Sequence, residues 1–237
     1  MILEIDAGNT FIKWRVLEQN GARGKLLTRE LSEQSIPDSW LQKFSKIRVA
    51  SVAGKEINLQ LKVIFQALEQ VEPLFAKTTA EQAGLKNSYV DPQRMGVDRW
   101  LAMLAAFKKA GGACCVVDCG SAITVDHVDH EGQHIGGHII PGLRLMQKGL
   151  LENTSEILVD HSLKSFNPQP GKDTNSAVSN GIDFAFVALA EKIVKELNIE
   201  HNALYITGGD GELFYKMAGC GQLEHDLVLD GLAWALS

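Results

Sequence analysis

The sequence predicts an α/β protein built from two copies of one unit, and two observations lead to this prediction. Strand, helix and strand alternate along the first half of the chain, which is typical of α/β domains. An apolar strand also ends in aspartate, a small residue, glycine and a polar residue at 6–9 and again at 118–121. The two aspartates lie 118 − 6 = 112 positions apart in 237 residues, so we expect a duplication, with domains over 1–111 and 112–237.

The composition is that of an ordinary folded protein, with 45% apolar and 22% charged residues. The net charge of −6 argues against nucleic acid as the main partner, because phosphate binding generally requires a basic excess. Asp6 interrupts the N-terminus too early for a signal peptide, and no apolar run reaches the ~18 residues of a membrane span. We therefore expect a cytoplasmic protein that binds neither nucleic acid nor membrane.

The first repeated segment predicts a β-hairpin with polar groups at its tip. Gly8 permits a tight turn, while Asn9 and Thr10 leave backbone N–H groups and side-chain donors above it. An anion could lie there, with Asp6 beside it to hold a cation or a water. An inert hairpin can have the same pattern, so the repeat decides the interpretation. Two such hairpins facing each other would surround a metal-bound polyphosphate.

The first half continues with further strands and helices. We expect a third strand within 21–29, a buried strand over 46–52, an amphipathic helix over 57–68 and a strand over 74–77. The irregular polar stretch 84–96 is long for a compact domain, and such loops are usually functional. It leads into a helix over 97–107, which Gly111 and Gly112 then break.

Asp98 lies in the first turn of that helix, and two interpretations stay open. The helix dipole stabilises a carboxylate there, so Asp98 could simply pair with Arg99 on a solvated face. Alternatively, the two residues could form a general base and an anion-binding cation at the mouth of a cleft.

The second half repeats the alternation after its hairpin. We expect a turn at 131–132, a strand over 134–140, a helix over 143–151, a loop over 165–172, a helix over 174–197, a strand over 203–206, a last strand over 224–228 and a helix over 229–236. Thr174 is expected to cap its helix. The turn Thr207-Gly208-Gly209 could hold a nucleotide against bare backbone, although a capping glycine explains it nearly as well.

Several motifs for other chemistry are missing or weak. The sequence contains neither a GxxxxGK[ST] loop nor a GxGxxG turn, so a nucleotide would bind through neither. The cysteines at 114, 115, 119 and 220 do not have the usual zinc spacings, and we expect them to be small core residues. His134 and His138 lie four apart without an acidic or cysteine partner, so we do not expect a metal there.

Five motifs occur in the order found in type III pantothenate kinases, and the sequence resembles that family over nearly its whole length. They are Asp6-Ala7-Gly8-Asn9-Thr10, Gly96-Val97-Asp98-Arg99, Asp118-Cys119-Gly120-Ser121-Ala122-Ile123-Thr124, Gly136-Gly137-His138-Ile139-Ile140-Pro141-Gly142 and Thr207-Gly208-Gly209. The resemblance implies two duplicated ribonuclease H-like domains with a nucleotide cleft between them, as in the superfamily of acetate and sugar kinases, heat-shock ATPases and actin. It also implies ATP-dependent phosphorylation of pantothenate, the first step of coenzyme A biosynthesis. The enzyme would be a homodimer that needs Mg²⁺ and a monovalent cation, potassium or ammonium.

The resemblance also implies roles for individual residues. The phosphate loop that binds ATP would consist of Asp6, Ala7, Gly8, Asn9, Thr10, Phe11, Ile12 and Lys13. The pantothenate contacts would be Tyr89, Gly96, Val97, Asp98, Arg99 and Thr174. Asp98 would be the proton acceptor, Asp118 the ligand of the monovalent cation, and Asp6 would lie near the divalent cation. Ser121 stands where the family usually has an ATP-contacting threonine, and because the hydroxyl is kept we expect it to contact ATP.

Two alternative functions stay open at this point. One is a kinase of the same superfamily that acts on another small hydroxylated metabolite. The other is a non-enzymatic regulator, because the family includes members named as accessory factors for transcription. The presence of Asp6, Asp98 and Asp118 together favours catalysis.

Overall fold

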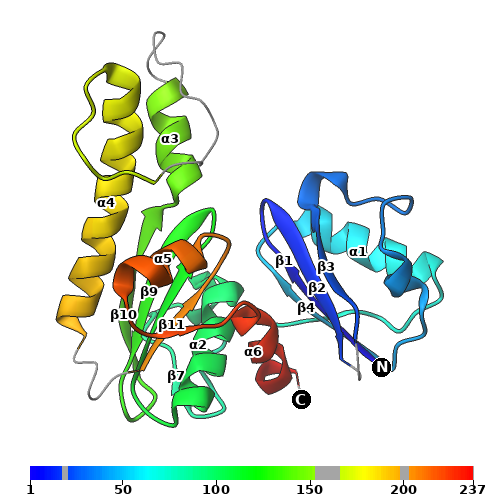
Figure 1. The fold of residues 1–237 in the computed structure, drawn as a ribbon. Coiled ribbons are helices and arrows are strands. Elements are labelled where there is room, and N and C mark those ends of the chain that lie inside the picture. The colour runs from blue at the N-terminus through cyan, green and yellow to red at the C-terminus, as the bar shows by residue number, and fades with distance from the viewer. Residues whose placement is uncertain (18–20, 153–165, 198–202, 237) are drawn as a thin grey trace. The chain divides into compact units, whose positions relative to one another are not determined.

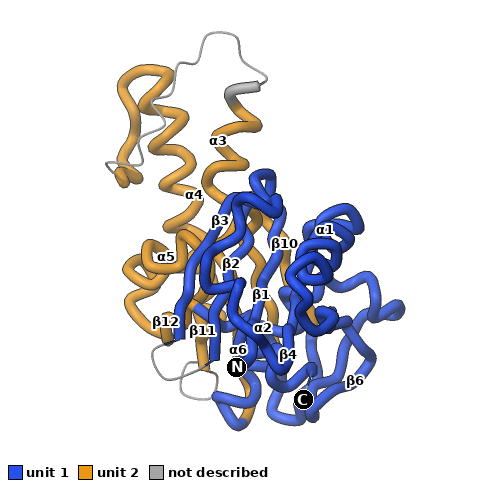
Figure 2. The backbone as a smooth tube through the Cα atoms, turned by 90° about the vertical axis from the view of Figure 1, so that its right-hand side faces the viewer, with its two compact units in different colours: residues 1–111, 128–135, 226–237 blue, residues 112–127, 136–225 orange. Residues whose placement is uncertain are grey.

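The computed structural model describes residues 1–17, 21–152, 166–197 and 203–236, and it has an α/β fold with two five-stranded sheets (Figure 1). The predicted fold class is confirmed. The chain forms two compact units, each of which contains segments that are distant in sequence (Figure 2). Unit 1 comprises residues 1–111, 128–135 and 226–237, and unit 2 comprises 112–127 and 136–225. The division into domains over 1–111 and 112–237 stays a prediction.

The sheet of unit 1 has the strand order β3-β2-β1-β4-β5. Its strands are β1 (Ile2–Ala7), β2 (Phe11–Leu17), β3 (Arg23–Leu27), β4 (Lys46–Ser51) and β5 (Leu74–Phe75). β1 pairs antiparallel with β2 and parallel with β4. These strands confirm the predicted ones, although β5 is shorter, and helix α1 (Lys55–Ala67) begins two residues before the predicted start.

The second sheet repeats this order as β10-β9-β8-β11-β12. Its strands are β8 (Cys114–Cys119), β9 (Ala122–Val128), β10 (His134–Pro141), β11 (Ala203–Thr207) and β12 (Gln222–Leu223). β8 pairs parallel with β11, as β1 does with β4. Each strand of one sheet therefore has a counterpart of the same rank in the other, which confirms the duplication.

Five longer helices and several short elements complete the described chain. The helices are α2 (Val97–Ala110), α3 (Leu143–Glu152), α4 (Thr174–Glu196), α5 (Gly211–Ala218) and α6 (Leu227–Ala235). The short elements are β6 (Glu81–Gln82), β7 (Leu85–Lys86) and the 3₁₀ turns η1 (Thr28–Glu30), η2 (Asp38–Leu41) and η3 (Pro92–Arg94). Gly111 ends α2 in the left-handed conformation at φ 64°, which confirms the predicted break. Within the described residues, no helix is long and apolar enough to span a membrane.

Two predictions about helix starts are wrong. Thr174 does not cap α4, because it is the first helical residue and Asp173 precedes it as the cap. The Asp173 carboxylate accepts the backbone N–H of Ser176 at 3.0 Å, and the Ser176 hydroxyl completes a capping box. The strand predicted over 224–228 is also wrong, because α6 begins at Leu227 and its apolar side chains are buried as a helical face.

Alternation along β1 separates an apolar face from a charged face. Leu3 and Ile5 are fully buried in the core under α1, together with Trp40, which stacks on Phe65 with ring centroids 5.3 Å apart. Glu4 points to the opposite face and is also fully buried. A buried carboxylate is stable only when cations or donors compensate its charge.

Two arginines compensate Glu4 and connect it to the helices of unit 1. Arg15 and Arg48 lie 2.7 Å and 3.1 Å from its carboxylate oxygens. Arg15 also reaches Asp230 of α6 at 2.7 Å, and Lys109 of α2 lies 3.0 Å from the same carboxyl group. Burial alone would raise the pKa of Asp230, but the hydrogen bonds from Arg15 and Lys109 hold it below its usual value. The charges therefore connect β1 and β2 to α6 and α2.

We predict that Glu4→Gln destabilises unit 1 by an amount near the lower end of about 3–5 kcal/mol, because Arg48 loses its buried counter-charge while Arg15 keeps Asp230. All four tryptophans, at 14, 40, 100 and 234, lie in unit 1, so urea unfolding followed by tryptophan fluorescence reports on that unit. Glu72→Gln is the matched control, because Glu72 pairs with Lys62 on the exposed surface. Equal midpoints for the two variants would contradict the role of Glu4.

Candidate functional site

The tip of the first hairpin is a turn fixed from two sides. The backbone N–H of Gly8 donates to the carbonyl of Phe11 at 3.0 Å and closes the turn. Thr28, at the start of η1, donates its hydroxyl to the Gly8 carbonyl at 2.7 Å and its N–H to the Thr10 carbonyl at 3.0 Å. Asn9 and Thr10 remain exposed. The tip is therefore a fixed loop that presents polar groups to solvent.

The residues beside the tip differ in what they can offer a ligand. Asp6 and Lys13 are direct partners across β1 and β2, which places a carboxylate and a cation about 4.5–5.5 Å apart at Cβ. Both are partly exposed. Ala7 and Ile12 are fully buried, because their side chains belong to the core. Among the eight residues predicted to bind ATP, these two could contribute only backbone groups.

Asp98 lies where the sequence predicted it, in the first turn of α2. Its carboxylate accepts the backbone N–H of Arg99 at 2.8 Å and is partly exposed. Gly96 precedes the helix, and a Cβ at this position would lie only 2.5 Å from an Asp98 carboxylate oxygen. Glycine at this position therefore leaves room for the carboxyl group.

Arg99 does not lie on a solvated face, because it is only 7% exposed. Its Nη1 donates to the hydroxyl of Tyr89 at 2.9 Å, and its guanidinium carbon lies 5.8 Å from the centre of the tyrosine ring. The structure thus brings the loop over 84–96 onto α2. Tyr89, Gly96, Val97, Asp98 and Arg99 form one cluster in unit 1, and we call it the Tyr89–Arg99 cluster.

The second hairpin is fixed by neighbouring turns of unit 2. The Gly120 N–H donates to the Ala122 carbonyl at 3.0 Å, and the Gly142 N–H donates to the Ser121 carbonyl at 3.1 Å. The Asp210 N–H donates to the Cys119 carbonyl at 2.9 Å. Ser121 is exposed at the tip, as its proposed contact with a ligand requires.

Asp118 packs against the Thr207-Gly208-Gly209 turn. It is the register partner of Thr207 at the end of β11. Gly208 has φ +93°, and a Cβ there would lie 2.5 Å from a carboxylate oxygen of Asp118 and from the Cys119 carbonyl. Only glycine fits this close approach without displacing Asp118.

Asp210 was not singled out from the sequence, and the structure places it close to the second hairpin. Burial raises the pKa of its carboxyl group, and the positive charge of Arg144 opposes this shift. The pKa of the Cys119 thiol is raised mainly by burial and further by the negative charges of Asp118 and Asp210. The negative charges of Asp118 and Asp210 are therefore both close enough to affect the Cys119 thiol. The sequence signal that could have drawn attention to Asp210 is its position directly after a strand and a pair of glycines.

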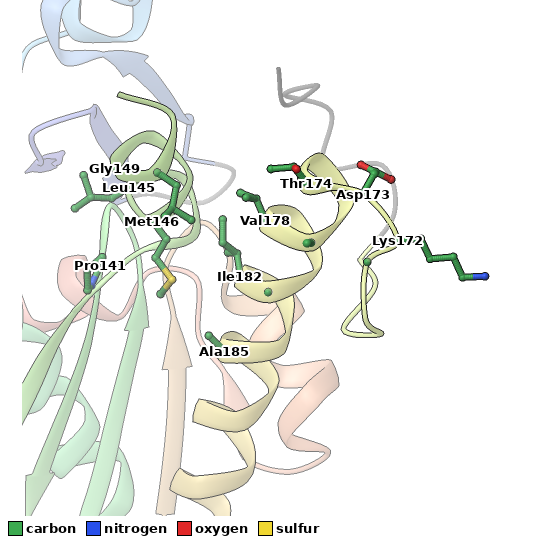
Figure 3. A pocket seen from close by; sticks show the side chains of 14 residues that line it. Pro141, Leu145, Met146, Gly149, Lys172, Asp173, Thr174, Val178, Ile182 and Ala185 are labelled. Carbon is green, nitrogen blue, oxygen red and sulfur yellow. The ribbon is translucent and has the colours of Figure 1, made fainter. Parts of the chain in front are cut away.

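Thr174 belongs to unit 2, at the first residue of α4 and at the edge of an open groove of about 1100 Å³ between α3 and α4 (Figure 3). Met146 of α3 lies across this groove from Val178 and Ile182 of α4, and Leu145 also lines it. The groove is therefore mainly apolar, with Thr174 among its few polar groups.

Three of the four cysteines lie in a buried strand, and His134 and His138 differ in their exposure. Cys114, Cys115 and Cys119 are buried free thiols in β8, which confirms their core role, and burial raises the pKa of Cys114 to about 12. His134 is fully buried, whereas His138 is exposed. In the part of the chain that the structure describes, no three His, Cys, Asp or Glu side chains form a group that could hold a metal ion.

We predict that Gly208→Ala destabilises unit 2 by about 1–3 kcal/mol, because alanine is strained at this φ and its Cβ meets the Cys119 backbone. Thermal unfolding followed by circular dichroism is the suitable measurement, since the tryptophans lie in unit 1. Gly209→Ala is the matched control, because a Cβ there has no atom within 4 Å and should change stability by less than about 0.5 kcal/mol. Indistinguishable melting curves would contradict the close approach at Gly208.

The sequence model of the type III pantothenate kinase family matches residues 2–196. The type III pantothenate kinase of Pseudomonas fluorescens strain Pf0-1 is 37% identical, covering 99% of this chain and 98% of the relative. That of Marinobacter nauticus is 34% identical, covering 98% of this chain and 96% of the relative.

Two solved structures share the fold. One, described as a Baf family transcriptional activator from Campylobacter jejuni, has a TM-score of 0.63 at 21% identity and covers 98% of this chain and 95% of its own. The other, described as a 2-dehydro-3-deoxygalactonokinase from Sinorhizobium meliloti, has a TM-score of 0.55 at 10% identity and covers 99% of this chain and 98% of its own. The chain therefore belongs to the type III pantothenate kinase family.

Proposed function

We propose that the protein transfers the γ-phosphoryl group of ATP to pantothenate, the first step of coenzyme A biosynthesis. The observation that carries this proposal is the Tyr89–Arg99 cluster, in which α2 presents a partly exposed carboxylate next to a buried, oriented guanidinium. The near full-length similarity to relatives named type III pantothenate kinase gives the substrate class. Pantothenate-dependent release of ADP from ATP is the direct test, and a panel of other hydroxylated metabolites would identify a different kinase.

Phosphoryl transfer needs in-line positioning and positive charge on the transferred group rather than covalent chemistry from the protein. The backbone N–H groups around Gly8 to Thr10 suit the phosphates, and Lys13 adds a cation on the same hairpin. The exposed Ser121 hydroxyl would contact ATP from the second hairpin. Asp6 fits Mg²⁺, which binds proteins through one or two carboxylates and keeps most of its waters, and the ion would neutralise phosphate charge.

Asp98 would accept the proton of the attacking pantothenate hydroxyl. Its partial exposure leaves it accessible, and its hydrogen bond with the Arg99 N–H sets its orientation. Arg99 would bind the polar end of the substrate, since Tyr89 holds the guanidinium in place. Gly96 and Val97 would contribute backbone contacts beside them.

Asp118 would bind a monovalent cation, potassium or ammonium. A carboxylate close to a polyphosphate would otherwise add repulsion to an anionic site. The second carboxylate at Asp210 strengthens the negative potential that attracts such a cation. Gly208 supports the assignment, because the absence of a side chain there leaves the Asp118 carboxylate undisturbed.

We further propose a cytoplasmic homodimer with its pantothenate site at the dimer interface, where Thr174 contacts the substrate. The groove between α3 and α4 supports a dimer, because Leu145 and Leu150 are 51% and 43% exposed beside it and such apolar surfaces are typically covered in homodimers.

The free cysteines fit the reducing environment of the cytoplasm. The net charge of −6 fits partners other than nucleic acid. We do not propose the alternative of a non-enzymatic regulator, because the solved structure described as a transcriptional activator shares only its fold with this chain.

We predict that activity requires a monovalent cation of the size of potassium. Replacing potassium by sodium or by tetramethylammonium at constant ionic strength should depress ADP release while the circular dichroism spectrum stays unchanged. Asp118→Asn should reduce this dependence, because it removes the charge that binds the cation. Full activity of the unmodified protein in tetramethylammonium alone would remove the cation from the mechanism.

We predict that Asp98→Asn folds and binds ATP but loses turnover by at least ~10², because asparagine keeps the shape and a hydrogen bond but cannot accept the proton. Steady-state ADP release measures turnover, and calorimetry measures ATP binding. Asp91→Asn is the matched control, because Asp91, like Asp98, accepts a backbone N–H at the start of a helical turn, that of Gln93 at 3.2 Å. Unchanged turnover in Asp98→Asn would leave the carboxylate with a role at the helix start only.

A further inference from the structure

Ser88, which is exposed, and His134, which is buried, are in contact directly beside the Tyr89–Arg99 cluster. The Ser88 hydroxyl lies 2.8 Å from Nδ1 of His134, and the His134 side chain is fully buried. The imidazole ring also lies against Tyr89, with ring centroids 6.3 Å apart and planes inclined by 34°. His134 therefore contacts two consecutive residues of the loop that carries Tyr89.

The segment that carries His134 is itself rigid. Asp129 accepts the N–H groups of Glu131 and Gln133 at 2.9 Å and 2.8 Å through one carboxylate oxygen. Gly132 donates to the Asp129 carbonyl at 3.1 Å, which closes the turn. This turn, residues 129–134, fixes the backbone to which the imidazole is attached.

The same turn binds the start of the loop through its backbone. Lys86 donates its N–H to the Gly132 carbonyl at 2.8 Å, and Lys86 and Gln133 form a parallel bridge. A Cβ on Gly132 would lie 2.0 Å from the Gly84 carbonyl oxygen, so the two backbones are in close contact. The loop is thus attached at Gly84 and Lys86 by backbone, and at Ser88 and Tyr89 by His134.

We propose that His134, fixed by the Ser88 hydroxyl, is a positioning residue that holds Tyr89 and through it the Arg99 guanidinium for pantothenate. The inference rests on the proposed function, since it assumes that Tyr89 and Arg99 contact that substrate. His134 acts on one side of the Tyr89 ring, while Arg99 donates to the Tyr89 hydroxyl at 2.9 Å. Removing the Ser88 hydroxyl takes away one of the contacts that fix the imidazole and therefore loosens this arrangement.

Ser88→Ala is the decisive variant, because Ser88 is exposed and the change removes one hydrogen bond without a buried cavity. We expect the KM for pantothenate to rise about 3–10-fold, the change that corresponds to one hydrogen bond, with the KM for ATP unchanged and the melting temperature lowered by only about 2–4 °C. Ser88→Thr keeps the hydroxyl and should restore the KM. Ser45→Ala is the matched control, because its hydroxyl donates to the Met1 carbonyl at 2.8 Å on another exposed part of unit 1.

His134→Phe keeps a ring beside Tyr89 and loses the hydrogen bond. It should raise the KM for pantothenate as Ser88→Ala does, and the double variant should be no worse than either single one. An unchanged KM in Ser88→Ala, or a parallel change in the KM for ATP, would overturn the inference while leaving the proposed function intact. Absence of pantothenate-dependent ADP release in the unmodified protein would overturn the proposed function and this inference with it.

Discussion

The buried carboxylate of Glu4 is the constraint on which the arrangement of unit 1 depends. A charge in the central strand is tolerated only because Arg15 and Arg48 lie 2.7 Å and 3.1 Å from it. Arg15 in turn reaches Asp230, and Asp230 binds Lys109 in the last turn of α2. The hairpin sheet and the C-terminal end of α2 are therefore connected by a continuous series of charges.

Close packing between α2 and α6 extends this constraint to the first turn of α2. A Cβ on Gly231 of α6 would lie 2.2 Å from the Leu101 carbonyl oxygen, so the two helices approach at backbone distance. An α-helix of 14 residues is a rod of roughly 21 Å, and fixing one end and the middle also fixes the other end. That other end carries Asp98 and Arg99. Charges far from the Tyr89–Arg99 cluster thus contribute to its position.

The two copies of the hairpin have different chemical surroundings despite the same strand order. Lys13 lies across from Asp6 in the first copy, whereas the position 13 + 112 = 125 in the second copy is Val125, which is buried. In the second copy a glycine turn, Gly208, instead approaches the Asp118 carboxylate. The duplication therefore conserves backbone geometry, while the charge next to each aspartate has diverged. This difference fits separate roles for the two carboxylates.

Local patterns were sufficient for most of the longer strands, the repeat and the position of Asp98, because each depends on neighbouring residues. Asp173 and Thr174 are both good capping residues, and the choice between them depends on the reciprocal bond with Ser176. The apolar run Leu227 to Leu229 fits a strand or a helix equally, so periodicity could not decide its structure. Asp230 and Arg15 are 215 positions apart, and Ser88 and His134 are 46 apart. Contacts of this kind follow from the tertiary fold and leave no local signal.

The loop over 84–96 shows how an irregular segment can position Tyr89, a residue that we propose contacts the substrate. Ordering each residue costs roughly 1–2 kcal/mol of backbone entropy, so an unsupported loop would have to pay this cost when the ligand binds. Here the protein has already ordered it. Asn87 donates its N–H to the Ala80 carbonyl at 2.8 Å and accepts the Tyr89 N–H at 2.9 Å, while Thr78 donates to the Met95 carbonyl at 3.0 Å. Because Tyr89 is held before any ligand arrives, more of the binding free energy of the Tyr89–Arg99 cluster remains available for the substrate.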